Sequence, residues 1–84
     1  MLKNNLKYFE YFTVCKESGI LIVKGTLRID RRMLGLADIF VYGKYVWFDG
    51  NVRKGYSGTL NECTLFRPAN EIEIEFFKRQ YNES

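Results

Sequence analysis

Apolar and polar residues alternate along the first part of the chain with the period of two that is typical of β-strands. Between Leu6 and Cys15, the side chains of Leu6, Tyr8, Phe12 and Val14 share one side of this period. The segment is also rich in β-branched and aromatic residues, which favours a strand. A short helix over the same residues stays an open alternative.

A second strand is predicted from Ile20 to Ile29, because Lys16–Gly19 supplies the turn residues that join it to the first strand as a hairpin. Gly25 interrupts this strand and indicates a bulge or bend, a feature that curls small sheets. After Asp30, which can cap a helix, the sequence predicts a brief helical turn over residues 31–34.

Two further strands are predicted at Ala37–Tyr42 and Tyr45–Phe48. Gly43-Lys44 lies between them and is short for a turn, so one long bent strand stays an alternative. Asp49-Gly50 favours a two-residue type I′ hairpin turn, after which Val52–Tyr56 should fold back on the preceding strand.

Ser57-Gly58 predicts another turn, and Leu60–Arg67 reads as the last strand. Asn70 followed three residues later by Glu73 has the form of a capping box, which predicts a C-terminal helix from Glu71 to about Asn82. Glutamates alternate with apolar residues in this segment, so a strand is the competing interpretation.

The expected fold is therefore of the α+β class: a small twisted antiparallel sheet, or half-open barrel, of five to six strands with a C-terminal helix. With 84 residues, the chain is expected to form a single domain, residues 1–84. The hydrophobic share is 46% and the aromatic share 17%, which is enough for a small packed core and argues against disorder.

The two thiols, Cys15 and Cys63, are distant in sequence, and the chain has no His. A four-ligand zinc site within one chain is thereby excluded, and no cofactor is expected. No N-terminal apolar run indicates a secretory signal, so both cysteines are expected to be reduced residues of the core or its edge. The longest apolar stretches are too short to span a bilayer. We expect a soluble, cytoplasmic protein without membrane contact.

Catalytic motifs are missing from the sequence. Without His there is no side chain that ordinarily titrates near neutral pH, and neither a G-x-S-x-G elbow nor a Walker-type phosphate loop is present. Carboxylates such as Asp30 and Asp38 read as solvated surface acids. We expect a protein that is not an enzyme.

Two groups of residues are candidates for binding a partner or nucleic acid. In the first, rings that can stack on nucleobases alternate with cations that can meet phosphates. In the second, arginines cluster around a connector and can clamp phosphate or pair with carboxylates. The first group is Lys44, Tyr45, Trp47, Arg53, Lys54 and Tyr56, and the second is Arg28, Arg31 and Arg32. The structural alternative is that the rings fill the core and the cations solvate its rim.

Charge is polarised along the chain. Residues 1–58 hold ten basic and five acidic side chains, a net charge of +5, whereas residues 59–84 hold three basic and five acidic ones, a net charge of −2. Such a division is typical of a surface that meets nucleic acid on one side, or of a two-signed surface that meets a two-signed partner.

The run from Thr64 to Phe77, with its Arg67-Pro68-Ala69-Asn70 segment leading into an acidic helix, resembles the ending of small accessory proteins of phages and prophages. Asn70 stands where Thr is commoner in that ending, and both residues cap helices. The resemblance covers about the last quarter of the chain and implies no activity. It implies a compact protein of a mobile element that acts stoichiometrically on a host protein.

The leading hypothesis is a non-enzymatic protein that inhibits or modulates a larger host protein acting on nucleic acid, with an anti-CRISPR-type inhibitor of an RNA-guided nuclease as the specific case. Contact with the RNA of such a CRISPR effector nuclease is part of this hypothesis. The alternative is a small barrel that binds RNA or single-stranded DNA directly and loses affinity with salt and on Trp47→Ala or Lys54→Ala. The sequence does not indicate an oligomeric state.

Overall fold

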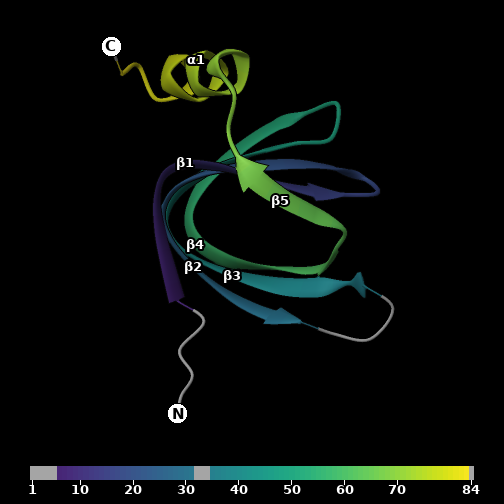
Figure 1. Ribbon diagram of the computed structural model, residues 1–84. Helices are drawn as coiled ribbons and strands as arrows, with labels where there is room; N and C mark the ends of the chain where they lie inside the picture. The colour runs from purple at the N-terminus through teal and green to yellow at the C-terminus, as the bar shows by residue number, and fades with distance from the viewer. Residues whose placement is uncertain (1–5, 32–34, 84) are drawn as a thin grey trace.

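The computed structural model describes residues 6–31 and 35–83, with side chains described from Tyr11 onward. Over these residues the chain forms one antiparallel sheet of five strands, in the order β4-β3-β2-β1-β5, and a C-terminal helix (Figure 1). The α+β fold class predicted from the sequence is confirmed. The elements are β1 (Leu6–Lys16), β2 (Gly19–Arg31), β3 (Ala37–Phe48), β4 (Val52–Cys63), β5 (Leu65–Pro68) and α1 (Glu71–Gln80).

The sheet is rolled. Strands β4 and β5 lie at opposite ends of the strand order, yet Thr64 alone separates them in the sequence. The end of β4 must therefore curl round to β1, where the Thr64 N–H donates to the carbonyl oxygen of Cys15 at 3.0 Å. Figure 1 shows the strands curving around a common interior, with α1 beyond one end of the roll.

A pair of glycines allows β2 and β3 to approach closely in mid-strand. Gly25 and Gly43 face each other in the register, with φ values of 152° and 153°. A Cβ atom on Gly25 would lie 2.5 Å from the carbonyl oxygen of Tyr42, and one on Gly43 would lie even closer to that of Lys24. Only glycine fits both positions. The irregularity predicted at Gly25 is accompanied by a register shift in the adjoining part of β1.

Two turn predictions are wrong; a third, for the hairpin after β3, is confirmed in its pairing of Val52–Tyr56 with the end of β3 but not in the length of its turn. Gly43-Lys44 bends one continuous β3, which was the open alternative, and Ser57-Gly58 lies within a continuous β4. Ser57 has a positive φ of 56°, as turn residues often do, but it lies next to a register shift. This conformation therefore forms a bulge within β4 rather than a turn between two strands. The third turn, after β3, spans residues 49–51 rather than Asp49-Gly50 alone, since Phe48 pairs with Val52.

The predicted last strand, Leu60–Arg67, is divided between two strands at opposite edges of the sheet. Its first part completes β4, and its second part is β5, which pairs with β1. Glu62, with a φ of 59°, lies just before the division, where the chain leaves one edge for the other. The short helical turn predicted over residues 31–34 is wrong at Arg31, which ends β2; residues 32–34 lie outside the described residues.

The C-terminal helix is confirmed, and the strand alternative is wrong. The Glu73 N–H donates to the Asn70 side chain at 2.8 Å, and the Asn70 N–H donates to the Glu73 carboxylate at 2.9 Å. This capping box satisfies two of the N–H groups that a helix start leaves unpaired. The helix ends at Gln80, two residues before the predicted end.

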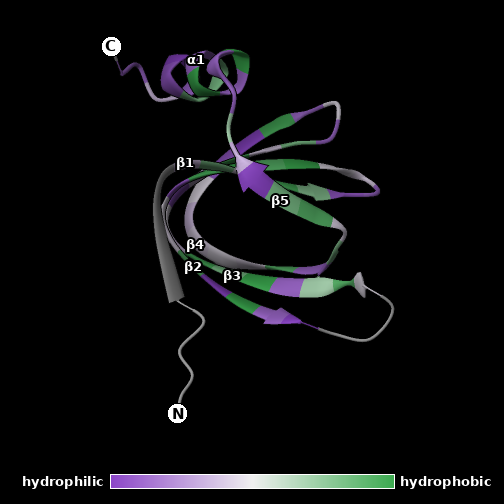
Figure 2. Cartoon of the chain, viewed as in Figure 1, coloured by the Kyte–Doolittle hydropathy of each residue, from purple (hydrophilic) through white to green (hydrophobic). Residues whose placement is uncertain are grey.

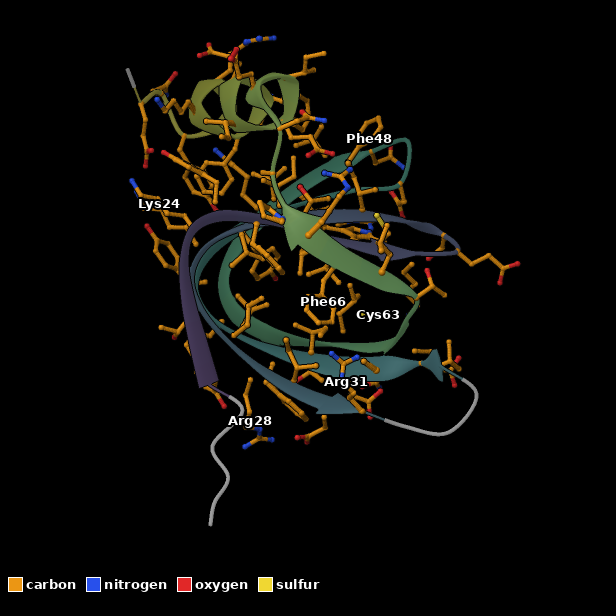
Figure 3. The ribbon with its side chains drawn as sticks, viewed as in Figure 1. Lys24, Arg28, Arg31, Phe48, Cys63 and Phe66 are labelled. Atoms are coloured by element: carbon orange, nitrogen blue, oxygen red, sulfur yellow. The ribbon has the colours of Figure 1, made fainter. Side chains whose placement is uncertain are left out.

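Alternation along the strands sends side chains to two faces, which we call the inner face, inside the roll, and the outer face, which α1 covers at one end. Figure 3 shows Cys63 and Phe66 inside the roll, and Phe48 near α1. In Figure 2 hydrophobic and hydrophilic residues alternate along β2 and β3. The buried inner core is Phe12, Val14, Leu21, Val23, Leu27, Ile29, Ala37, Ile39, Val41 and Cys63. The smaller outer core is Ile22, Val46 and Phe77.

Both cysteines are free thiols; Cys63 is buried and Cys15 is half-buried. Their predicted place in the core or at its edge is confirmed. Across the part of the chain that the structure describes, no helix has the length and apolar character needed to cross a membrane.

Candidate binding surfaces

The turn between β3 and β4 decides which predicted binding residues share a face. With the loop at residues 49–51, Tyr45 pairs with Gly55 and Trp47 pairs with Arg53, whereas Lys44 pairs with Tyr56. A two-residue turn would have shifted the register by one and sent every β4 side chain to the opposite face.

The predicted aromatic and basic group is therefore split between the two faces of the sheet. Tyr45, Trp47 and Arg53 belong to the inner face, and Lys44, Lys54 and Tyr56 to the outer face. The expectation that Tyr45, Trp47 and Tyr56 form one stacking platform is wrong, because Asn51 belongs to the turn and sets the register of β4.

On the inner face, the predicted residues border a cavity of about 180 Å³. The rings of Tyr45 and Trp47 are half-buried and pack against the inner core, as the structural alternative requires. Arg53 lies at the more exposed margin and donates to the Asp49 carboxylate at 3.2 Å. The cavity is lined by Leu21, Val41, Tyr45, Trp47, Arg53, Gly58, Thr59 and Leu60.

Glycines make room for the Tyr45 ring on the inner face of β4. A Cβ atom on Gly55 would lie 2.6 Å from the Tyr45 hydroxyl, so any side chain there would displace the Tyr45 ring. A Cβ atom on Gly58 would lie 3.5 Å from the ring, an ordinary contact distance. The ring thus crosses over Gly55, and the space beside Gly58 stays open to the cavity.

On the outer face, the C-terminal end of α1 engages both predicted lysines. Lys44 donates to the Glu83 carboxylate at 2.6 Å, and Lys54 donates to the carbonyl oxygen of Gln80 at 2.9 Å. Both amines also lie over the ring of Tyr81, at 5.2 and 5.4 Å from its centroid. The hydrogen bond from Lys44 lowers the pKa of Glu83 and raises that of Lys44.

Beyond the helix, the outer face carries exposed rings. Tyr56 on β4 pairs with Lys44, two residues along β3 from Tyr42, beside the register shift of this strand pair, and Tyr56 keeps 68% of its surface exposed. Phe40, two residues before Tyr42 on the same face, is covered by the Arg28 guanidinium at 4.0 Å from the ring centroid. We call Arg28, Phe40, Tyr42 and Tyr56 the outer strip.

The predicted arginine cluster is not one site. Arg28 is on the outer face, where it also approaches the Asp30 carboxylate at 3.6 Å. Arg31 turns inward and lies over the ring of Phe66 at 5.3 Å, as Figure 3 shows. Because they are three residues apart on one strand, alternation separates them. Arg32 lies outside the described residues.

Sequence reasoning missed Phe40 and Tyr42 as surface residues. The signal was present, since both alternate with Ile39 and Val41 and so share the face opposite the aliphatic core. It also missed Glu83 as a partner of cations, because the contact to Lys44 depends on where α1 packs.

Two groups that could react chemically, the Cys63 thiol and the Glu73 carboxylate, are held in structural roles. Burial raises the pKa of the Cys63 thiol to about 11, so the thiol is protonated and a poor nucleophile near neutral pH. The Glu73 carboxylate is occupied by Arg67, with two hydrogen bonds of 2.8 Å. Among the described residues, no three His, Cys, Asp or Glu side chains are grouped so as to hold a metal ion.

Comparison of the chain with known proteins finds no matching family model, no matching curated protein and no matching solved structure.

Proposed function

We propose that this protein is a non-enzymatic binding protein that inhibits or modulates a larger protein acting on nucleic acid, and that the outer strip is its contact surface. The observation that carries the proposal is the exposure of two neighbouring tyrosines, 48% for Tyr42 and 68% for Tyr56. Tyrosine is among the residues that contribute most binding energy at protein interfaces. The hydrogen-bonded sheet already fixes the backbone of both tyrosines, so binding a partner would cost little conformational entropy.

A protein partner suits the outer face better than bare nucleic acid. Direct binding of nucleic acid needs cations that are free to meet phosphates. Lys44 and Lys54 are engaged by the end of α1, and Arg28 is stacked on Phe40. What remains for a partner is aromatic surface with hydroxyl groups, which is typical of protein interfaces.

The class of target is inferred from charge. Residues 1–58 have a net charge of +5 and residues 59–84 a net charge of −2. Glu71 and Glu75 are exposed in the first half of α1, so that half presents negative charge to its surroundings, whereas the last turn carries Lys78 and Arg79. A nucleic-acid-handling protein offers a basic channel to such a helix and a bound polyanion to the basic strands. An RNA-guided nuclease is the specific case we propose.

The proposal is tested by measuring whether the purified protein captures and inhibits an RNA-guided nuclease. Tagged protein is mixed with a panel of purified RNA-guided nucleases loaded with guide RNA, and DNA cleavage is measured at equimolar inhibitor. We expect one nuclease to be captured and inhibited. Tyr42→Ser combined with Tyr56→Ser should weaken that inhibition about tenfold or more, since interface anchors contribute about 2 kcal/mol or more.

The matched control is Leu65→Ser, which removes a 51% exposed apolar side chain from β5 rather than from the outer strip or α1, and should leave inhibition unchanged. Lack of any captured or inhibited nuclease would contradict the proposal. So would retardation of a labelled oligonucleotide by the protein alone with a steep dependence on salt, which is the behaviour of a direct nucleic-acid binder.

A further inference from the structure

Strand β4 has one unpaired edge. It ends the strand order and pairs with β3 alone among the described strands. The N–H and C=O groups of Gly55 point toward β3, since the Tyr81 hydroxyl contacts both at 3.2 and 3.1 Å while donating to the carbonyl oxygen of Tyr45 at 2.6 Å. Main-chain groups alternate in direction along a strand. Those of Lys54 and Tyr56 therefore point to the free edge.

The neighbouring edge strand does not cover this part of β4. β5 has 4 residues against the 12 of β4, and it begins directly after the C-terminal end of β4. The open side of the roll thus lies beside Val52–Tyr56, the regular stretch before the bulge at Ser57.

The inner-face cavity lies next to the same edge. Arg53, Gly58, Thr59 and Leu60 of β4 contribute to its lining, and its volume is about 180 Å³. An apolar cavity of about 150 Å³ is large enough for a benzene molecule. The cavity therefore has room for one leucine or phenylalanine side chain, though it is smaller than the roughly 300 Å³ or more of sites for drug-sized ligands.

The charged side chains along the edge of β4 favour particular residues on either side of the apolar side chain of a bound peptide. Arg53 and Lys54 lie in the stretch before the bulge, and Glu62, the acidic residue of β4, lies at its far end. The Arg53 side chain remains 59% exposed despite its contact with Asp49. Acidic residues beside an apolar anchor would complement this charge.

We propose that β4 binds an extended segment of another protein by strand addition, with one apolar side chain in the inner-face cavity and acidic residues beside the exposed Arg53. Main-chain hydrogen bonds to Lys54 and Tyr56 supply affinity, and the cavity supplies specificity. The cavity is on the opposite face from the outer strip, and the edge uses only the main chain of Tyr56, so the site does not depend on the function proposed for that strip.

The test uses the fluorescence of Trp47, the chain's one tryptophan, which lines the cavity. The probes are acetylated seven-residue peptides with a central Leu, Ile or Phe and two acidic residues on each side. We expect at least one to change the Trp47 emission saturably. Replacing its central residue by Gly, its acidic residues by Lys, or the amides that face β4 by N-methyl groups should each weaken binding about tenfold, the effect of about 1.4 kcal/mol.

Variants of the protein provide the second measurement. Gly58→Val fills the cavity from a position where a Cβ atom makes ordinary contact, so the fold should persist, as thermal unfolding would verify, while peptide binding falls about tenfold. Tyr42→Ser, a change in the outer strip that lies on β3 and not on the edge strand, should bind the peptide as the unchanged protein does. Failure of the outer-strip function is thereby distinguished from failure of this site.

Three outcomes would overturn the inference. The first is no emission change with any peptide of the set at millimolar concentration. The second is equal affinity for the N-methylated peptide or for the Gly58→Val variant. The third is a dimer in sedimentation experiments that the peptides do not dissociate, since a second copy would then occupy the edge of β4.

Discussion

Glu73 is the residue at which three parts of the chain meet. Its carboxylate accepts two hydrogen bonds from Arg67 at 2.8 Å, one from the buried Thr13 hydroxyl at 2.9 Å, and one from the Asn70 N–H at 2.9 Å. These donors, chiefly Arg67, lower the pKa of Glu73 to about 2 from its ordinary 4.5. One carboxylate thus joins β5, β1 and the start of α1.

The lowered pKa of Glu73 predicts a specific acid sensitivity. Because the folded state holds this group ionised, its stabilisation is complete above about pH 4.5 and is lost as the pH falls toward about 2. Glu73→Gln should lower the free energy of unfolding by about 2 kcal/mol at pH 7, and the difference should shrink at pH 3. Urea unfolding followed by Trp47 fluorescence measures both values. Glu75→Gln, an exposed carboxylate on the same helix, is the control; equal effects of the two variants would contradict the assignment.

Among the elements, β2 and β3 show how a backbone contact decides strand geometry. Gly25 and Gly43 pair at positive φ, and neither has space for a Cβ atom. The sequence indicated the irregularity at Gly25, but it could not indicate that Gly43 would lie opposite. That pairing follows from the register of β2 and β3, which places residues that are distant in sequence directly opposite each other.

A substitution at this glycine pair should be costly. Gly43→Ala places a methyl group against the backbone of Lys24 and Gly25 at a φ of 153°, so we expect a loss of about 2–4 kcal/mol in stability. Thermal unfolding measures the change as a lowered Tm. Gly58→Ala, whose Cβ atom would make an ordinary contact, is the matched control and should change Tm by a few degrees at most. Similar Tm values for both variants would refute the steric argument.

At the scale of the whole molecule, α1 is held to the sheet by its C-terminal residues. The Tyr81 hydroxyl accepts from the Gly55 N–H and donates to the carbonyl oxygen of Tyr45, so it bridges β4 and β3. Its ring packs against Phe77, the buried residue of α1, at 5.0 Å between centroids. Burial raises the pKa of Tyr81, which keeps the hydroxyl protonated as a donor.

Removing this hydroxyl should loosen the helix from the sheet. Tyr81→Phe leaves main-chain groups of β3 and β4 without a partner and should cost about 1–3 kcal/mol in urea unfolding. Hydrogen exchange should quicken at Gly55, whose N–H loses its acceptor, and along α1. Tyr56→Phe removes the hydroxyl of an exposed ring and should change stability by less than about 0.5 kcal/mol. Unchanged exchange at Gly55 in Tyr81→Phe would show that the bridge does not hold the helix.

Local chemistry made much of the fold predictable. The first strand was predictable from the alternation around Val14, the second from the apolar run around Ile22 after its turn residues, and α1 from the capping box of Asn70 and Glu73, because each signal acts within a few residues. The two free thiols, Cys63 in the core and Cys15 at its edge, were also expected from the sequence. Where prediction failed, as at Ser57-Gly58, turn-forming residues occupied a bulge inside a long strand, a use that local sequence does not distinguish from a turn.

The candidate site was less predictable than the fold. The sequence by itself determined which residue types were available near the β3–β4 hairpin: rings at Tyr45, Trp47 and Tyr56 beside cations. Only the tertiary structure decided their grouping, because inclusion of Asn51 in the turn sets the register and sends Tyr56 to the opposite face from Tyr45 and Trp47. The roll of the sheet and the packing of α1 then determined which rings stay exposed and which cations are neutralised, since both depend on contacts between residues far apart in the chain.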